Sequence, residues 1–246
     1  MENLLCIHIF RNEWVQLRFR YENKYLIDVP TAELLRARAA AIMKPDENGG
    51  SYIVHNLYLD DRYDSCYYGK YMGRLERNKY RLRYYNGDTS FIRLERKHKE
   101  GLLSYKDTMT ISNEQYEMIK QGNLEFILNE EAPLWQTLAM VYRLKGLRPT
   151  AMFAYKRRAY VYEPGDVRFT FDSPPFQMGE TLPFHYEPLK MSYGKEAYSP
   201  MLLEVKYSRF LPEVIKRLLN GLPLARTDMS KYCVVREKGV LPHGEI

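Results

Sequence analysis

Charged side chains, most of them basic, recur at alternate positions in two parts of the segment Lys79–Lys106, which reads KYRLRYYNGDTSFIRLERKHKEGLLSYK. In the first part these are Lys79, Arg81 and Arg83, and in the second Arg93, Glu95, Lys97 and Lys99 share one face. Successive side chains of a β-strand point to opposite faces, so each strand here would have one apolar and one cationic face. Like charges on neighbouring strands repel each other. The arrangement therefore indicates a surface that binds an anion, although a solvated sheet face is the common explanation of a single basic strand.

Carboxylates accompany the cations on two further predicted strands. Glu22 and Lys24 lie two residues apart in the first, and Glu204 and Lys206 do so in the apolar segment 201–207, MLLEVKY. Carboxylates beside phosphate oxygens provide the ligands that Mg²⁺ or Mn²⁺ requires. The alternative for Glu204 is a structural ion pair with a neighbouring lysine or arginine, and the sequence leaves both open.

Motifs of several other enzyme classes are absent from the sequence. It contains no GxxxxGK[ST] and no GxGxxG, and its five histidines show no metal-ligand spacing. Its three cysteines are far apart and include no CxxC pair, so neither a zinc site nor a disulfide framework is indicated. Phosphoryl transfer needs none of these groups, because it depends mainly on positioning and charge neutralisation.

Composition favours a soluble protein with polyanionic partners. The chain has 246 residues, 22 of them tyrosine, a net charge of +6 and a pI near 9.0. Its apolar start, residues 4–10, is far shorter than a membrane-spanning helix and lacks the basic leader of a signal peptide. We expect a cytoplasmic protein with no transmembrane segment.

Turn and cap signals divide the chain into strands and helices. Asn86-Gly87-Asp88 and Glu100-Gly101 predict tight turns. Strands are predicted over residues 16–29, 52–59, three within 79–106, 150–162, 167–171 and 201–207. Helices are predicted over 30–43 with Thr31 as N-cap, from Asp60-Asp61 to about Gly73, and over 113–122, 133–146, 211–219 and 230–238. Residues 173–199 are predicted to be irregular.

Strands with one apolar and one charged face can form an open sheet or close into a barrel with the charged face inward. A lumen lined by Lys24, Arg81, Arg83, Lys97 and Arg168 would be costly if dry, because buried like charges destabilise a fold. It would hold water and bind a polyanion, while Glu22, Glu95 and Glu204 would offset part of the charge.

Short motifs in a fixed order carry a resemblance to a known family. They are Glu22-Asn23-Lys24-Tyr25, Arg81-Leu82-Arg83-Tyr84, Glu95-Arg96-Lys97, Ser104-Tyr105-Lys106, Tyr155-Lys156-Arg157, residues 168–172, Leu203-Glu204-Val205-Lys206 and Ser230-Lys231-Tyr232. This order is similar to that of the VTC (vacuolar transporter chaperone) domain, the polyphosphate polymerase branch of the triphosphate tunnel metalloenzymes in the CYTH-like superfamily. The resemblance covers residues 18–237, nearly the whole chain.

The resemblance implies an α+β fold: an antiparallel eight-stranded β-barrel, the triphosphate tunnel, with helices packed outside. It implies a tunnel domain over residues 18–240 after an N-terminal extension, 1–17. Phosphate-binding residues would be Lys24, Arg81, Arg83, Lys97, Lys106, Tyr155, Arg157, Arg168, Lys206 and Lys231. Of these, the catalytic ones would be Lys24, Arg81, Arg83, Lys97, Arg157 and Lys231. Glu204 and Glu22 would hold Mn²⁺ or Mg²⁺.

The implied reaction is transfer of the γ-phosphate of ATP onto a growing polyphosphate chain. The partners would be ATP and polyphosphate or triphosphate, with a membrane-protein partner encoded separately as a further possibility. Three alternatives stay open: a tripolyphosphate or nucleoside triphosphate hydrolase, a polyphosphate-binding module without chemistry, and a nucleic-acid binder. Nucleic acid is the least favoured ligand, because the tyrosines mostly oppose the cations and would pack in the core.

Overall fold

One antiparallel sheet occupies the centre of the molecule. The computed structural model describes residues 6–8, 14–16, 20–100, 103–177, 187–188 and 200–237. The eight long strands of this sheet are, in spatial order, β3 (Tyr21–Ile27), β13 (Met201–Tyr207), β10 (Val167–Asp172), β9 (Arg148–Tyr162), β5 (Ser51–Asp60), β6 (Glu76–Tyr85), β7 (Asp88–Glu100) and β8 (Leu103–Ile111). Two-residue strands extend it at its margins: β14 (Ala225–Arg226), β4 (Lys44–Pro45), β11 (Phe176–Gln177) and β12 (Glu187–Pro188). The expected α+β fold with an antiparallel sheet is confirmed.

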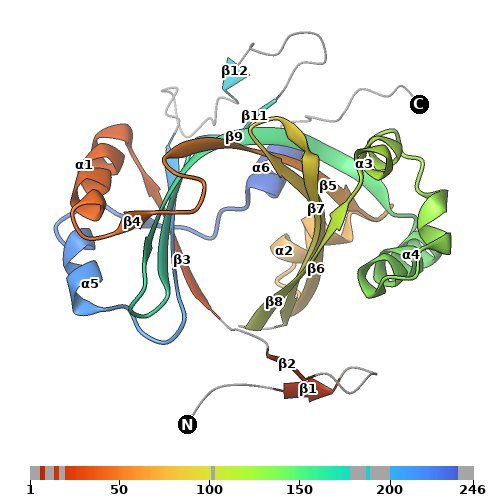
Figure 1. Ribbon diagram of the computed structural model, residues 1–246, viewed down its shortest axis with the longest axis horizontal. Coiled ribbons are helices and arrows are strands. Elements are labelled where there is room, and N and C mark those ends of the chain that lie inside the picture. Colours follow the sequence, from red (N-terminus) through yellow and green to blue (C-terminus); the bar gives the residue numbers. More distant parts are fainter. Residues whose placement is uncertain are drawn as a thin grey trace.

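The sheet curls until its two ends face each other, as Figure 1 shows. In the described part of the chain, however, no strand pairing joins β3 to β8, so the sheet does not close into the expected barrel. One ion pair crosses this gap, with Lys97 Nζ on β7 lying 3.1 Å from Glu22 Oε2 on β3. Side chains therefore connect the two ends where backbone hydrogen bonds do not.

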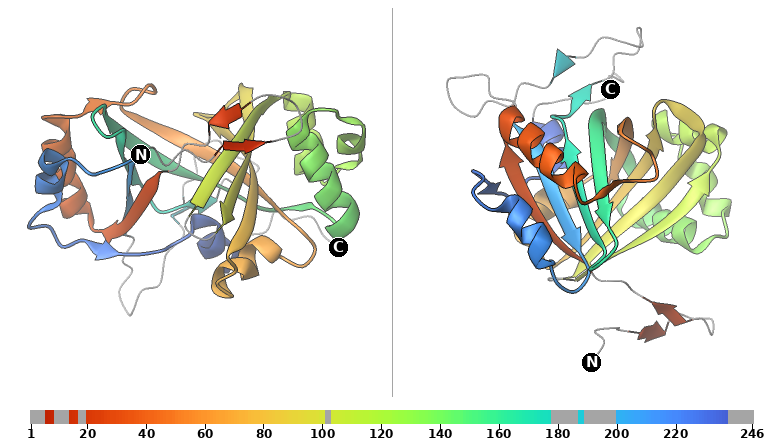
Figure 2. Two further views of the ribbon diagram at one scale, coloured as in Figure 1. Left: turned by 90° about the horizontal axis from the view of Figure 1, so that it is seen from below. Right: turned by 60° about the vertical axis from the view of Figure 1, so that its left-hand side comes forward.

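Helices cover the outside of the curved sheet on two sides (Figures 1 and 2). On one side they are α1 (Val29–Ala40) and α5 (Glu213–Leu219), and on the other α3 (Asn113–Lys120), the 3₁₀ helix η1 (Glu125–Asn129) and α4 (Pro133–Lys145). The remaining described helices are α2 (Ser65–Tyr71) and α6 (Lys231–Glu237). The first core lies where α1 and α5 cover β3, β13 and β10, and it includes Leu35, Phe169 and Ile215. The second lies where α3, η1 and α4 cover β5 to β8.

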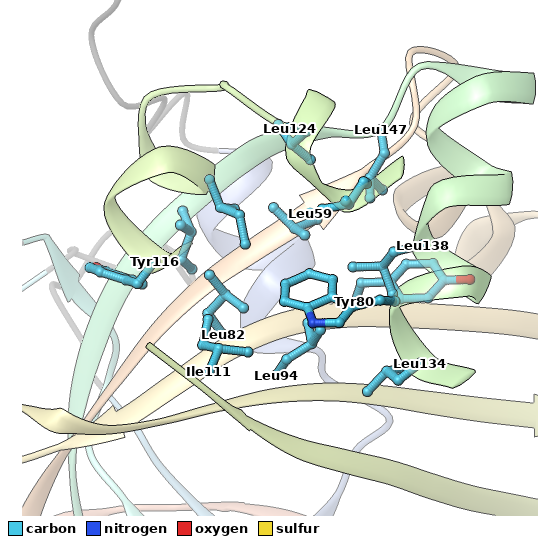
Figure 3. Close-up of a cluster of buried hydrophobic side chains, with 14 of the residues drawn as sticks. Leu59, Tyr80, Leu82, Leu94, Ile111, Tyr116, Leu124, Leu134, Leu138 and Leu147 are labelled. Atoms are coloured by element: carbon cyan, nitrogen blue, oxygen red, sulfur yellow. The ribbon is translucent and has the colours of Figure 1, made fainter. Parts of the chain in front are cut away.

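Alternation in the basic strands produces this second core, which Figure 3 shows in close-up. Tyr80 and Leu82 of β6 and Leu94 of β7 point outward and are buried in one cluster with Leu138 of α4 and Tyr116 of α3. A fully buried leucine contributes about 1.5–3 kcal/mol relative to an exposed one. The helices thus bury the apolar face of each basic strand, and the charged face is left on the inside of the curve.

Helix α1 starts before its predicted position. Asp28 Oδ1 accepts a hydrogen bond of 2.8 Å from the backbone N–H of Thr31, so Asp28 and not Thr31 is the N-cap. Thr31 is instead buried in the first turn. The predicted end at residue 43 was also too late, since the helix ends at Ala40.

The two aspartates before α2 accept hydrogen bonds from the first turn of that helix, although its N-cap position is Asp64. Asp60 Oδ1 accepts from the backbone N–H of Cys66 at 2.9 Å, and Asp61 Oδ1 accepts from that of Ser65 at 3.0 Å. Helix α5 begins at Glu213, later than predicted, with Pro212 at its N-cap.

The described residues before position 20 belong to a separate small sheet. β1 (Cys6–His8) and β2 (Trp14–Gln16) pair with each other in a separate two-stranded sheet. The predicted turn at Gly101 and most of the irregular segment 173–199 lie outside the described residues. Among the helices described, none has the length and apolar character needed to cross a membrane.

Candidate functional site

The concave side of the main sheet is called the inner face below. It carries the lysine and arginine side chains that occupy alternate positions along the strands. Antiparallel pairing sets them beside each other and beside carboxylates. Cross-strand neighbours on this face include Lys24 and Glu204, Lys206 and Arg168, Asp172 and Arg157, Arg81 and Glu95, and Lys97 and Lys106. The inner face therefore combines a surplus of positive charge with a few carboxylates.

Asp172 is the centre of the most buried charge cluster on the inner face. Its Oδ1 accepts a hydrogen bond of 2.6 Å from Arg157 Nε, and its Oδ2 accepts one of 2.7 Å from the terminal nitrogen of the same guanidinium. Oδ2 also accepts from Lys231 Nζ at 2.6 Å. Asp172 is fully buried, so it neutralises two cations that have little access to water.

Glu204, the predicted metal ligand, lies beside this cluster but is held less tightly. The cations around its carboxylate are Lys206 at 3.1 Å, Lys24 and Lys231 at 3.8 Å, and Arg157 at 3.9 Å. Burial alone would raise the pKa of Glu204, but the positive charges of Lys206 and Lys231 hold it well below its usual value. The carboxylate is thus ionised and surrounded by four cations.

Glu95 organises a second cluster on β6, β7 and β8. Its Oε2 accepts from Arg81 Nε at 2.7 Å and lies 3.9 Å from the guanidinium of Arg83, while Oε1 accepts from Lys106 Nζ at 3.1 Å. Burial would raise the pKa of Glu95, but the two arginines lower it. The predicted role of Glu95 in offsetting the positive charge agrees with these contacts.

Glu22 connects the two ends of the sheet. One carboxylate oxygen lies 3.1 Å from Lys24 Nζ and the other 3.1 Å from Lys97 Nζ. Burial raises the pKa of Glu22, but Lys206 and Lys24 outweigh it and bring the pKa to about 2. The pKa of Lys97 is lowered. Burial is the largest cause, and repulsion from Lys206 and Lys24 lowers the pKa further, whereas the negative charge of Glu22 raises it.

Tyrosines on the inner face link the clusters. Arg83 donates a hydrogen bond of 3.3 Å to the hydroxyl of Tyr155, and Lys231 Nζ lies 4.7 Å from the centre of the same ring. Arg81 donates one of 3.0 Å to the hydroxyl of Tyr58. Tyr58 and Tyr155 thus lie on the same face as the cations, whereas the sequence predicted that most tyrosines would lie on the opposite face.

Arg168 lies in a third cluster. It donates a hydrogen bond of 2.6 Å to Asp46 Oδ2 and one of 3.3 Å to the hydroxyl of Tyr52, which itself donates to Asp46 at 2.8 Å. Asp46 comes from the segment between the predicted helix over residues 30–43 and the predicted strand over residues 52–59. Arg168 remains part of the same surface, because Lys206 is its cross-strand neighbour.

Helix α6 delivers Lys231 to the inner face, and this corrects the expectation that all helices pack outside. Tyr232 is buried among inner-face side chains, and its ring stacks on Tyr58 with 4.9 Å between ring centres. Its hydroxyl donates a hydrogen bond of 2.7 Å to Asp60 Oδ2. Asp60 therefore fixes α6 as well as the start of α2, and with α6 the position of Lys231.

The described residues contain no group of three or more His, Cys, Asp or Glu side chains that could hold a metal by themselves. Glu204 and Glu22 can nevertheless contribute to a divalent site, since Mg²⁺ is commonly bound by one or two carboxylates together with substrate phosphates and water. The donor chemistry of these two residues fits an ion that is completed by phosphate oxygens.

All the predicted site residues lie on the inner face, and all of them except Arg168 are joined through the contacts of Asp172, Glu204, Glu95, Glu22 and Tyr155. Reading the sequence missed Asp172, Asp46 and Tyr58. Asp172 directly follows the predicted strand over residues 167–171 and lies four positions after Arg168, so both share one face of an extended chain, and that spacing could have identified it. No sequence signal places Asp46 near Arg168, because their contact depends on the fold of the loop before β5.

Comparisons with known proteins agree with this fold. A family model described as the VTC domain matches residues 19–238. Among solved structures, a putative adenylyl cyclase from Hippeastrum with a dominant triphosphatase activity superposes with a TM-score of 0.58 at 16% identity, covering 92% of this chain and 98% of that one. A putative adenylate cyclase from Bacillus halodurans gives 0.50 at 11% identity, covering 82% and 84%. At these identities the likeness is one of fold. No curated protein matches the chain.

Proposed function

Because the chain belongs to the VTC domain family, within the triphosphate tunnel metalloenzymes, we propose that it is a polyphosphate polymerase-like phosphotransferase. The proposed reaction moves the γ-phosphate of ATP onto the end of a polyphosphate chain held along the inner face. The observation that carries the proposal is an excess of positive charge on the inner face, which holds more lysines and arginines than carboxylates. These cations come from β3, β6, β7, β8, β9, β10, β13 and α6.

The proposed role of the cations is to replace their carboxylate partners with phosphate oxygens. Arg157 binds both oxygens of the Asp172 carboxylate with two nitrogens, which is the paired geometry that a guanidinium uses for phosphate. Arg81 directs two nitrogens to one oxygen of Glu95. Lys24, Lys97 and Lys231 would bind as point charges. Together they would align the phosphate chain and draw off the charge that develops as the terminal group is transferred.

The metal would act with Glu204 and Glu22. A divalent ion bound there supplies additional neutralisation of phosphate oxygens. Our assignment gives Glu204 the main role, because it is held less tightly than Asp172 and can change partner when a cation arrives. Lys106, Tyr155, Arg168 and Lys206 would extend the binding surface. The buried free thiols of Cys66 and Cys233 suit the reducing cytoplasm, where we expect the protein to act.

A triphosphate hydrolase is the second candidate, and one finding favours it. The structure from Hippeastrum, which shares the fold, is described as having a dominant triphosphatase activity. In this alternative the same cations hold the phosphates and water replaces the phosphate acceptor. The third candidate function is polyphosphate binding without catalysis.

One assay separates these functions. Purified protein is incubated with ATP and Mn²⁺ or Mg²⁺, and products are resolved as long polyphosphate, free phosphate or neither. Long polyphosphate supports the polymerase, and free phosphate alone supports the hydrolase. Arg81→Gln is expected to abolish either product, whereas Lys44→Gln, at an exposed position, is the matched control. If neither product forms but calorimetry shows tight triphosphate binding, the protein is a binding module without catalytic activity.

A further inference from the structure

Strand β9 carries cations on both of its faces, and the proposed function uses only one. Arg157 points to the inner face, so Lys156 and Arg158 point outward. Arg158 lies directly opposite Phe171 of β10. In the described part of the chain its guanidinium has neither a hydrogen bond nor an ion pair, although Arg157 beside it has several. The outward charge of Arg158 is therefore uncompensated.

A second arginine approaches the same place from α1. The guanidinium carbon of Arg36 lies 5.3 Å from the centre of the Phe171 ring, and a terminal nitrogen lies 3.4 Å from Met201 Sδ. Its Nε is the one buried side-chain nitrogen or oxygen without a hydrogen-bond partner among the described residues. Native proteins rarely leave such a donor unsatisfied, so this atom calls for an explanation.

The contact with Phe171 brings the two arginines together. Arg36 lies over the ring of Phe171, and directly opposed residues of an antiparallel pair have Cβ atoms about 4.5–5.5 Å apart. Burial lowers the pKa of Arg36, and the positive charge of Arg158 lowers it further. Among the described residues, the one carboxylate bonded to either arginine is Glu33, which contacts Arg36 from an exposed position on α1. Both arginines thus lie next to Phe171, with one peripheral counter-charge in this part of the chain.

We propose that Arg36 and Arg158 form a second oxyanion-binding site on the outer face of the sheet, and that it takes a phosphate group. A phosphate oxygen at this point would satisfy the buried Nε of Arg36 and neutralise Arg158. Planar guanidinium groups bind phosphate through paired N–H donors, and an anion shared by two arginines removes their repulsion. The source is either free inorganic phosphate or the end of a polyphosphate chain, since both present the same oxygens.

This site is separate from the inner face. Arg157 and Arg158 are consecutive, so the two anions would lie on opposite sides of one sheet layer. The proposal does not depend on which reaction the inner face performs, because no side chain of the inner face contributes to it.

The test follows the arginine Nε–Hε resonances by nuclear magnetic resonance during titration with inorganic phosphate, at constant ionic strength set with sodium chloride. In the wild type, the Arg36 resonance is expected to shift saturably. The same shift is expected in Arg81→Gln, which disables the inner face, and in Lys44→Gln, which removes one exposed positive charge elsewhere. In Arg158→Gln the midpoint should rise at least about tenfold, as expected for losing a charge-assisted hydrogen bond.

A parallel titration with long-chain polyphosphate, compared at equal concentration of chain ends, identifies the source. A lower midpoint than that of inorganic phosphate assigns the site to chain ends, and an equal or higher midpoint assigns it to free phosphate. Three results would overturn the proposal: no saturable shift with either titrant, an unchanged midpoint in Arg158→Gln, or loss of the shift in Arg81→Gln. Thermal unfolding of each variant checks that the fold is retained.

Discussion

Replacing Asp172 by asparagine should destabilise the free protein and strengthen its response to triphosphate. The change removes the carboxylate that holds Arg157 through two hydrogen bonds and Lys231 through a third, and leaves both cations buried. Breaking a buried ion pair costs about 3–5 kcal/mol. Glu204 remains within 3.9 Å of Arg157 and 3.8 Å of Lys231, so we expect the lower end, about 3 kcal/mol.

This cost corresponds to a drop of about 6–12 °C in Tm, since 1 kcal/mol shifts the Tm of a domain of this size by about 2–4 °C. Tripolyphosphate should reverse most of it, because its oxygens neutralise the two cations that lost their partner. At one hundred times its Kd a ligand stabilises by about 2.7 kcal/mol. The increase in Tm on adding tripolyphosphate should therefore be larger for Asp172→Asn than for the wild type.

The assay is thermal unfolding at a series of tripolyphosphate concentrations, with Asp107→Asn as control. Asp107 also bonds an arginine, Arg96, through two nitrogens, but its side chain is 38% exposed. Exposed pairs contribute less than about 1 kcal/mol, so the control should lose at most about 4 °C and respond to ligand like the wild type. If Asp172→Asn gains no more from tripolyphosphate than the control does, the carboxylate does not compete with phosphate and the reasoning fails.

Three further outcomes are expected. Glu204→Gln should fold, keep metal-free triphosphate binding and lose metal-dependent turnover, and unchanged Mn²⁺ dependence would end its assignment as a metal ligand. Because the pKa of Glu22 is lowered from 4.5 to about 2, its contribution to stability is complete above about pH 4.5 and is lost as the pH falls toward 2; acid unfolding of Glu22→Gln should lack this component. Calorimetry should show triphosphate binding more tightly than monophosphate, with an affinity that falls as salt rises; equal affinities for the two would contradict cooperative contacts on the inner face.

Local pattern was enough to predict which side chains share a face. The alternation through Lys79, Arg81 and Arg83 depends only on the extended backbone, and the hairpin at Asn86-Gly87 depends only on turn chemistry. Both agree with the structure. The family resemblance then supplied the curvature, which alternation leaves undecided.

Contacts between distant segments could not be read in the same way. Asp172 acquires its role from the register of β10 on β9 and from the docking of α6, which brings Lys231 from 59 positions further along the chain. Asp46 reaches Arg168 because of one loop conformation. The start of α1 was misplaced for a local reason, since Asp28 and Thr31 are both good N-caps and only the backbone path decides between them.

The pairing of β3 with β13 has a consequence for how the chain is made. Residues 21–27 pair with residues 201–207, about 180 positions later. At a synthesis rate of about 5–20 residues per second, β3 exists for roughly 10–35 s before its partner is available. During that time its strand edge and its apolar side have no native partner, and such edges pair readily with other chains. Closure over so long a separation is also slow, since folding rates fall as contacts become more distant in sequence. The first strand of the main sheet to be synthesised is thus among the last to be secured, and the yield of native protein should depend on how well β3 is protected until β13 arrives.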